Sequence, residues 1–223
     1  MQPLATYKAL CIDACDAQRA ARFWSATLGL EIREDRGVVV RLDGPRPQDR
    51  VWVNRVPEPA PAHNRLHLDV HTGSVAELLE LGATVRDDDH PWTVLEDPDG
   101  GDFCAFVREQ PPPQRLYEFV LNAVDPQAAA RWWAGLFGGR VEAVDDDGAW
   151  AVGEVPGAPF EWWIVSPPET RKTGKNRLHL DVDTGDLDRL LAHGARLLRP
   201  RGGDIDWHVL ADPEGNEFCA FTP

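Results

Sequence analysis

The sequence has few of the features that mark secreted, membrane or disulfide-rich proteins. Its four cysteines in 223 residues form no C-x-x-C pair, which excludes a disulfide scaffold and the common zinc-finger spacing. It has no apolar run of about 18 residues, the length needed for a transmembrane helix. The opening MQPLATYKAL lacks a basic start, an apolar stretch and a small-residue cleavage site. No secretory signal is therefore expected, and the protein is expected to be cytoplasmic.

Basic residues are also scarce. The chain has 23 Lys and Arg against 37 Asp and Glu, a net charge of −14. Such a surface repels phosphate backbones and anionic lipids, so neither nucleic acid nor a membrane is expected as a partner. The composition, 43% apolar with nine Trp, is that of a globular protein.

The chain contains an internal repeat. NRLHLDV occurs at 64–70 and again, unchanged, at 176–182. The run FCAF at 103–106 likewise returns at 218–221, each time shortly after an Asp-Pro pair. A proline-rich linker, REQPPPQ, lies between the copies and cannot continue a sheet. These features predict two tandem domains, residues 1–110 and 111–223.

Each copy divides again into two similar halves. A half begins with a strand, continues with an amphipathic helix that has a capping residue before it and a glycine after it, and ends with about three short strands. The four predicted helices begin after Asp16, Ser74, Asp125 and Asp186 and end before Gly29, Gly82, Gly138 and Gly194. The fold class predicted is α+β, built from four βαβββ modules.

These modules, with the D-P-x-G turn before the last strand and the motifs R-L-H-L-D-V and D-P-E-G-N-E-F-C, resemble the vicinal oxygen chelate superfamily. That group contains glyoxalases, bleomycin-resistance proteins and ring-cleaving dioxygenases, and the glyoxalase-like subgroup is the most similar. The resemblance implies that each tandem domain pairs its two modules into an open, curled sheet. The cavity of that sheet would hold a ligand or a divalent metal.

The resemblance also implies where metal ligands would stand, and these positions are mostly changed. Cys104 and Cys219 occupy the positions of the Glu in the last strands, and Arg65 and Arg177 replace the His of the first strands. A guanidinium has no lone pair to offer a metal. Glu118 is the one inherited ligand. The sequence therefore predicts no metal or other cofactor, and disfavours a divalent ion without excluding one.

Two readings are open for the cysteines at the vacant ligand positions, Cys104 and Cys219. They are thiolate ligands or nucleophiles, or they are small buried packing residues. Packing is favoured, because no cationic partner is expected on the same strand to lower the pKa of either thiol.

Strand alternation selects the polar candidates for a site. Because Leu66, Leu68 and Val70 form the core face of one repeated strand, its polar residues share the opposite face. The two sets are Arg65, His67 and Asp69, and Arg177, His179 and Asp181. Arginine suits anion or carbonyl recognition, and histidine suits proton transfer. The alternative is a satisfied structural network of the same residues.

Further ligand-binding candidates flank these strands. Glu118 and Asn122 lie on the opening strand of the second copy, and Trp52, Trp163 and Trp207 lie on or beside strands, where flat rings line cavities. If one copy is active, the second is favoured. In that case His179 and Arg177 are expected to line the deeper cavity.

Three functions follow in order of preference. The first is a metal-independent protein that binds a small organic metabolite, as a monomer or homodimer. The second is an enzyme of the lyase or isomerase kind, in which His67 or His179 moves a proton while Arg65 or Arg177 stabilises an oxyanion. The third is a divalent-metal glyoxalase or dioxygenase.

Overall fold

The computed structural model describes residues 2–58, 64–144, 148–160, 162–167, 172 and 174–223. It confirms the α+β class and the four βαβββ modules. The first module contains β1 (Thr6–Ala14), α1 (Ala17–Leu28), β2 (Glu31–Asp35), β3 (Val39–Asp43), the one-turn helix η1 (Pro47–Asp49) and β4 (Val51–Arg55). The second contains β5 (Leu66–Thr72), α2 (Val75–Glu80), β6 (Thr84–Asp87), β7 (Thr93–Glu96) and β8 (Asp102–Val107).

The second copy repeats this order. The third module contains β9 (Leu116–Asn122), α3 (Pro126–Phe137), β10 (Arg140–Ala143), β11 (Trp150–Gly153) and β12 (Trp162–Ser166). The fourth contains β13 (Leu178–Asp183), α4 (Leu187–Ala192), β14 (Arg196–Arg199), β15 (His208–Ala211) and β16 (Glu217–Phe221). All four predicted caps accept a hydrogen bond from the backbone amide three residues on, which fixes where each first strand ends.

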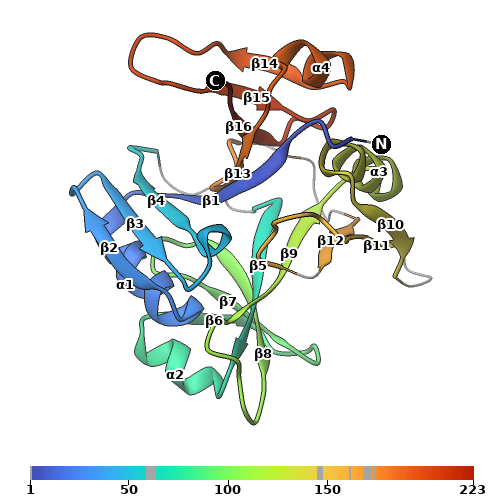
Figure 1. Ribbon diagram of the computed structural model, residues 1–223. Coiled ribbons are helices and arrows are strands. Elements are labelled where there is room, and N and C mark those ends of the chain that lie inside the picture. The colour runs from blue at the N-terminus through green and yellow to red at the C-terminus, as the bar shows by residue number, and fades with distance from the viewer. Residues whose placement is uncertain (1, 59–63, 145–147, 161, 168–171, 173) are drawn as a thin grey trace.

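The modules form two eight-stranded sheets, and they pair across the two copies rather than within them. The first sheet has the order β14-β15-β16-β13-β1-β4-β3-β2 and joins the first module to the fourth. The second sheet has the order β10-β11-β12-β9-β5-β8-β7-β6 and joins the third to the second. Figure 1 shows β1 lying beside β13, and β5 beside β9. The expected pairing of modules within each tandem domain is thus corrected.

The physical reason is that all four first strands present similar apolar faces. Leu10 of β1 lies opposite Leu180 of β13, and Leu66 of β5 lies opposite Leu121 of β9, so either pairing would satisfy the pattern of a buried face. The linker is held where it passes the end of α1. The amide of Arg115 donates to the carbonyl of Leu28, and a side chain at Gly29 would collide with the Pro113 carbonyl. These contacts direct the chain after the linker to the edge of β5, where β9 pairs with it.

The core is one continuous cluster between the sheets and the long helices. Trp24 of α1 packs on Phe103 of the second sheet with ring centroids 5.4 Å apart. Trp133 of α3 packs on Phe218 of the first sheet at 5.5 Å. Each long helix therefore contacts the sheet that does not contain its own module, which joins the two sheets. In the described part of the chain, no helix is long and apolar enough to cross a membrane.

Candidate functional site

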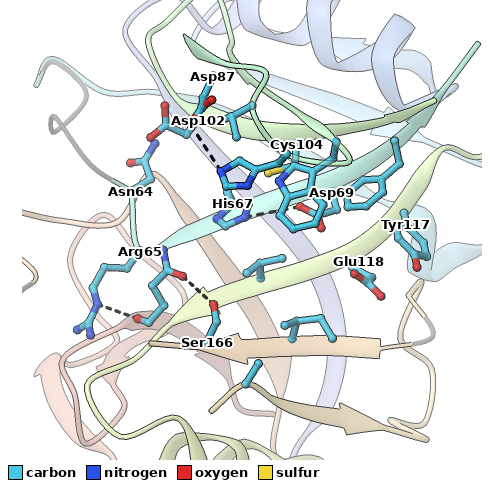
Figure 2. A pocket seen from close by; sticks show the side chains of 18 of the residues that line it. Asn64, Arg65, His67, Asp69, Asp87, Asp102, Cys104, Tyr117, Glu118 and Ser166 are labelled. Carbon is cyan, nitrogen blue, oxygen red and sulfur yellow. Dashed lines mark hydrogen bonds and ion pairs between the residues drawn. The ribbon is translucent and has the colours of Figure 1, made fainter. Parts of the chain in front are cut away.

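A cavity of about 760 Å³ opens on the face of the second sheet (Figure 2). Its polar floor consists of Arg65, His67, Asp69, Cys104, Glu118 and Asn122. Its aromatic wall consists of Trp92, Phe106 and Tyr117, and its charged rim includes Arg86, Asp87, His90 and Lys172. The volume lies in the range of small-molecule sites.

Strand register gathers the floor residues from three adjacent strands. Asp69 of β5 lies directly opposite Glu118 of β9 and directly beside Cys104 of β8. His67 stands two residues before Asp69 and therefore on the same face. The register of β5 with β8 and β9 thus brings together one imidazole, two carboxyl groups and one thiol.

Three of these side chains, His67, Asp69 and Cys104, each place a metal-ligating atom within 4.8 Å of the other two. The Nε2 of His67 is 3.6 Å from Oδ1 of Asp69, and the Cys104 thiol hydrogen-bonds the same carboxyl group. Oδ1 of Asp69 is buried and makes no hydrogen bond to any described residue. An orphaned buried oxygen beside nitrogen and sulfur donors fits a divalent ion.

Burial and charge set the protonation of the floor. Desolvation lowers the pKa of His67 to about 4, so its imidazole is neutral at pH 7 and offers a lone pair. Desolvation, assisted by the charge of Glu118, raises the pKa of Asp69 to about 8. Burial also raises the pKa of the Cys104 thiol. Without a cation on the floor, Asp69 and Cys104 are therefore protonated at neutral pH.

The caps show which residue occupies the ligand position of a first strand. Glu118 stands seven residues before its helix cap, Asp125, and His67 stands seven residues before the equivalent cap, Ser74. His67, and not Arg65, is thus the counterpart of Glu118. The assignment from sequence was two residues out, because residues two apart share a face and alternation alone cannot detect such a shift.

Arg65 is occupied by a structural contact. Its Nε donates to the carbonyl of Asn122, and its Nη2 lies 2.9 Å from Glu214, in the turn between β15 and β16 of the first sheet. Glu214 also accepts hydrogen bonds from the amides of Val124 and Asp125. The pair ties the second sheet to the first, so the structure does not support the expected role of Arg65 in binding an anion.

The second trio lies elsewhere. His179 and Asp181 are buried in the first sheet, 8% and 5% exposed, and neither lines the large cavity. The guanidinium of Arg177 contacts the thiol of Cys15 and the carbonyl of Glu58, beside a hollow of about 10 Å³. The expectation that His179 and Arg177 line the deeper cavity is therefore wrong, because the exchange of modules gives the open cavity to Arg65, His67 and Asp69.

None of the three selected tryptophans lines the large cavity. Trp163 is fully buried on the helix side of the second sheet, with its ring 4.5 Å from that of Trp133. Trp52 lies beside Arg41 on the first sheet, and Trp207 lies 5.6 Å from Phe221 there. Asn122, by contrast, lines the cavity as expected and accepts a hydrogen bond from the hydroxyl of Ser166 at 3.0 Å.

The aromatic wall was missed by sequence reasoning. The rings of Trp92 and Phe106 stack at 5.6 Å, and Phe106 meets Tyr117 edge to face at 5.1 Å. His90 extends the stack by lying 5.2 Å from Trp92. The internal repeat pairs Trp92 with Trp207 and so indicates that both belong to the same part of the module. It does not indicate which of the two lines an open cavity.

The cations around the cavity are paired with acids. Arg86 forms ion pairs with Glu96 at 2.5 Å and with Asp102 at 3.1 Å. Lys172 pairs with Glu217 at 2.5 Å. Because these positive charges are compensated, the polar character of the site is set by the floor, where His67 and Glu118 offer hydrogen-bond acceptors.

Comparison with known proteins agrees with this architecture. The chain is similar in fold to glyoxalase I from Zea mays, with a TM-score of 0.68 at 14% identity over 98% of this chain and 92% of that one. It is also similar to the cppA protein from Streptococcus pneumoniae TIGR4, with a TM-score of 0.52 at 11% identity over 100% and 99% of the two chains. At such identities the likeness shows the fold alone. No curated protein matches the sequence.

A family model decides the membership. The model of the glyoxalase-like domain matches residues 9–106 and, again, residues 118–221. The two matches correspond to the two sequence copies, although each copy contributes one module to each sheet. The chain therefore belongs to the glyoxalase-like domain family, with one family domain in each tandem copy.

Proposed function

We propose that the protein binds a small organic molecule in the cavity of the second sheet. The observation that carries the proposal is the 760 Å³ cavity, in which an aromatic wall stands beside a polar floor. Trp92 and Phe106 offer flat apolar surface, and His67 and Glu118 offer acceptors. This arrangement favours a ligand with a flat apolar part and a polar end that donates hydrogen bonds or accompanies a cation.

A divalent metal, which the fold of the family implies, fits the same floor. His67, Asp69 and Cys104 would hold it, because their ligating atoms converge and Oδ1 of Asp69 has no hydrogen-bond partner among the described residues. Such an ion polarises a carbonyl or hydroxyl oxygen of a bound molecule. From the sequence, only Glu118 was expected as a metal ligand. The three converging donors of the floor therefore support a metal more strongly than the sequence did.

A flat fluorescent phenol, 7-hydroxy-4-methylcoumarin, tests the binding proposal. The wild-type protein should bind it, and Trp92→Ala should weaken binding about fivefold or more, because loss of the stacking contact alone costs about 1 kcal/mol. Fluorescence titration measures both affinities. The matched control is Trp207→Ala, the same change at the counterpart of Trp92 on the first sheet. Equal affinity in wild type and Trp92→Ala would contradict this placement of the ligand.

Proton transfer is a second candidate function, supported by the protonation of the floor. His67 is neutral at pH 7 and can accept a proton from a bound molecule, while Asp69 retains a proton it can donate. If the protein has the activity named for its structural relative, glyoxalase I, His67→Gln should lower kcat about 100-fold or more, the scale of general acid–base catalysis. His208→Gln is the matched control, because His208 lies on β15 of the first sheet and does not line the cavity, and it should leave kcat unchanged.

A further inference from the structure

We propose that Cys11, His179, Asp181 and Cys219 form a second, closed site that binds zinc inside the first sheet. The four residues lie on three adjacent strands, β1, β13 and β16. The site is separate from the open cavity, none of whose lining residues it shares. Its role is to hold the two sequence copies together, because β1 belongs to the first copy and β13 and β16 to the second.

Strand register assembles these donors. Cys11 lies directly opposite His179, and Asp181 lies directly beside Cys219. Cys11, His179 and Asp181 each place a metal-ligating atom within 4.8 Å of the other two. Cys219, the register partner of Asp181 on β16, adjoins this group of three without belonging to it. One thiol, an imidazole and a carboxyl group thus converge, and the thiol of Cys219 lies next to the carboxyl group on the neighbouring strand.

The cluster is enclosed, and its polar groups are incompletely satisfied. The four residues are 3–8% exposed. The Nδ1 of His179 is buried without a hydrogen bond to any described residue, and its distance to Oδ2 of Asp13 is 4.0 Å. A buried polar atom without a partner is costly. A bound cation would give this nitrogen a partner.

The two sheets differ in the residues that the neighbouring first strand places opposite the repeated histidine and aspartate. Opposite Asp69 the second sheet has Glu118, whereas opposite Asp181 the first sheet has Ala9. One position further along the same face, opposite the histidine, the second sheet has Val120 and the first has Cys11. The first sheet thus lacks one carboxylate and gains one thiol.

The resulting donor set favours a structural zinc ion. Zinc takes four ligands from Cys, His and Asp in closed sites, whereas its catalytic sites keep one position open. Two thiolates favour zinc over magnesium, calcium or manganese. The sequence predicted no metal because donors were sought only at the ligand positions of the family. Cys11 does not occupy one of those positions.

A disulfide between Cys11 and Cys219 does not explain the cluster. Strand β13 lies between β1 and β16, so the two Cα atoms are separated by two strand spacings, about 10 Å. A disulfide requires a Cα separation below about 7 Å. Both thiols therefore remain available to an ion.

Zinc content tests the proposal. The purified protein should retain about one zinc ion per chain after dialysis, as expected of a closed four-ligand site. Cys11→Val, which introduces the residue that the second sheet has at this position, should lower the zinc content at least tenfold. Cys15→Ser, which removes an exposed thiol outside both clusters, should leave the content unchanged. Elemental analysis measures all three proteins.

Two results would overturn the proposal. One is a wild-type protein that contains no zinc, both as purified and after refolding with zinc chloride. The other is zinc that Cys104→Ser removes and Cys11→Val retains, which would place the ion in the open cavity.

Cobalt provides a test that does not depend on the folding of Cys11→Val. Cys104→Ser protein refolded with cobalt should show the intense near-ultraviolet band of thiolate-to-cobalt charge transfer, because Cys11 and Cys219 remain to bind the ion. Absence of the band would contradict the proposal.

Discussion

Arg65→Met should lower the free energy of unfolding by about 3 kcal/mol, the lower end of the range for breaking one side of a buried ion pair. The reason is that Glu214 would keep its charge without its guanidinium partner, in a place where the side chains of Arg65 and Glu214 are 6% and 16% exposed. The two backbone amides that also donate to Glu214 limit the loss. Urea unfolding at 25 °C measures the change.

Arg86→Met is the matched control for this prediction. Arg86 pairs with Glu96 at 2.5 Å, but both side chains are more than one-third exposed, so its loss should cost about 1 kcal/mol or less. A double-mutant cycle of Arg65→Met with Glu214→Gln isolates the coupling between the two sheets. If both arginine variants lost the same small amount, Arg65 would not be the tie that the geometry indicates.

The fold could be predicted from the sequence up to the level of the module. Cap residues and glycines place each helix, because they act locally, and all four predicted caps are present. The choice of partner is not local. Leu10 and Leu66 face apolar residues of equal suitability in either arrangement, so the exchange between copies is decided by tertiary packing, such as Trp24 on Phe103.

The sequence predicted which strand face carries the polar residues of the site, but not which of the two sheets has an open cavity. Alternation correctly put Arg65, His67 and Asp69 on one face, and these three line the cavity. Glu118 and Asn122, selected separately on the opening strand of the second copy, line it too. The same reasoning treated His179 as equivalent, because the two heptapeptides are identical. What distinguishes the two places is the neighbouring strand, and a repeat within one strand carries no information about that neighbour.

The pH dependence of stability provides the second large effect, in protein freed of divalent metal by a chelator. The folded-state pKa of Asp69 is about 8, against the ordinary value of 3.8. A raised carboxyl pKa means that the folded state holds a proton that the unfolded state has lost. Its contribution to stability is therefore complete below about pH 4 and is lost as the pH rises through 8.

Asp69→Asn should accordingly become more stable relative to wild type as the pH rises, by about 1.4 kcal/mol per pH unit between about pH 4 and 8. Asparagine cannot ionise, so the variant avoids burying a second negative charge beside Glu118. His67 acts in the opposite direction, since its lowered pKa of about 4 weakens the folded state as the pH falls below 6.5. It is present in both proteins, so its contribution cancels in the difference.

Urea titrations of both proteins at pH 5, 6, 7 and 8 measure this difference, and a constant value would show that Asp69 is not kept protonated by the fold. Repeating the series with zinc at saturation tests the floor as a metal site. An ion held by His67, Asp69 and Cys104 requires the ionised carboxylate, so zinc should stabilise wild type more than Asp69→Asn. The advantage of Asp69→Asn at pH 8 should then become smaller. If zinc left the difference unchanged, the cavity floor would be a site for organic ligands alone.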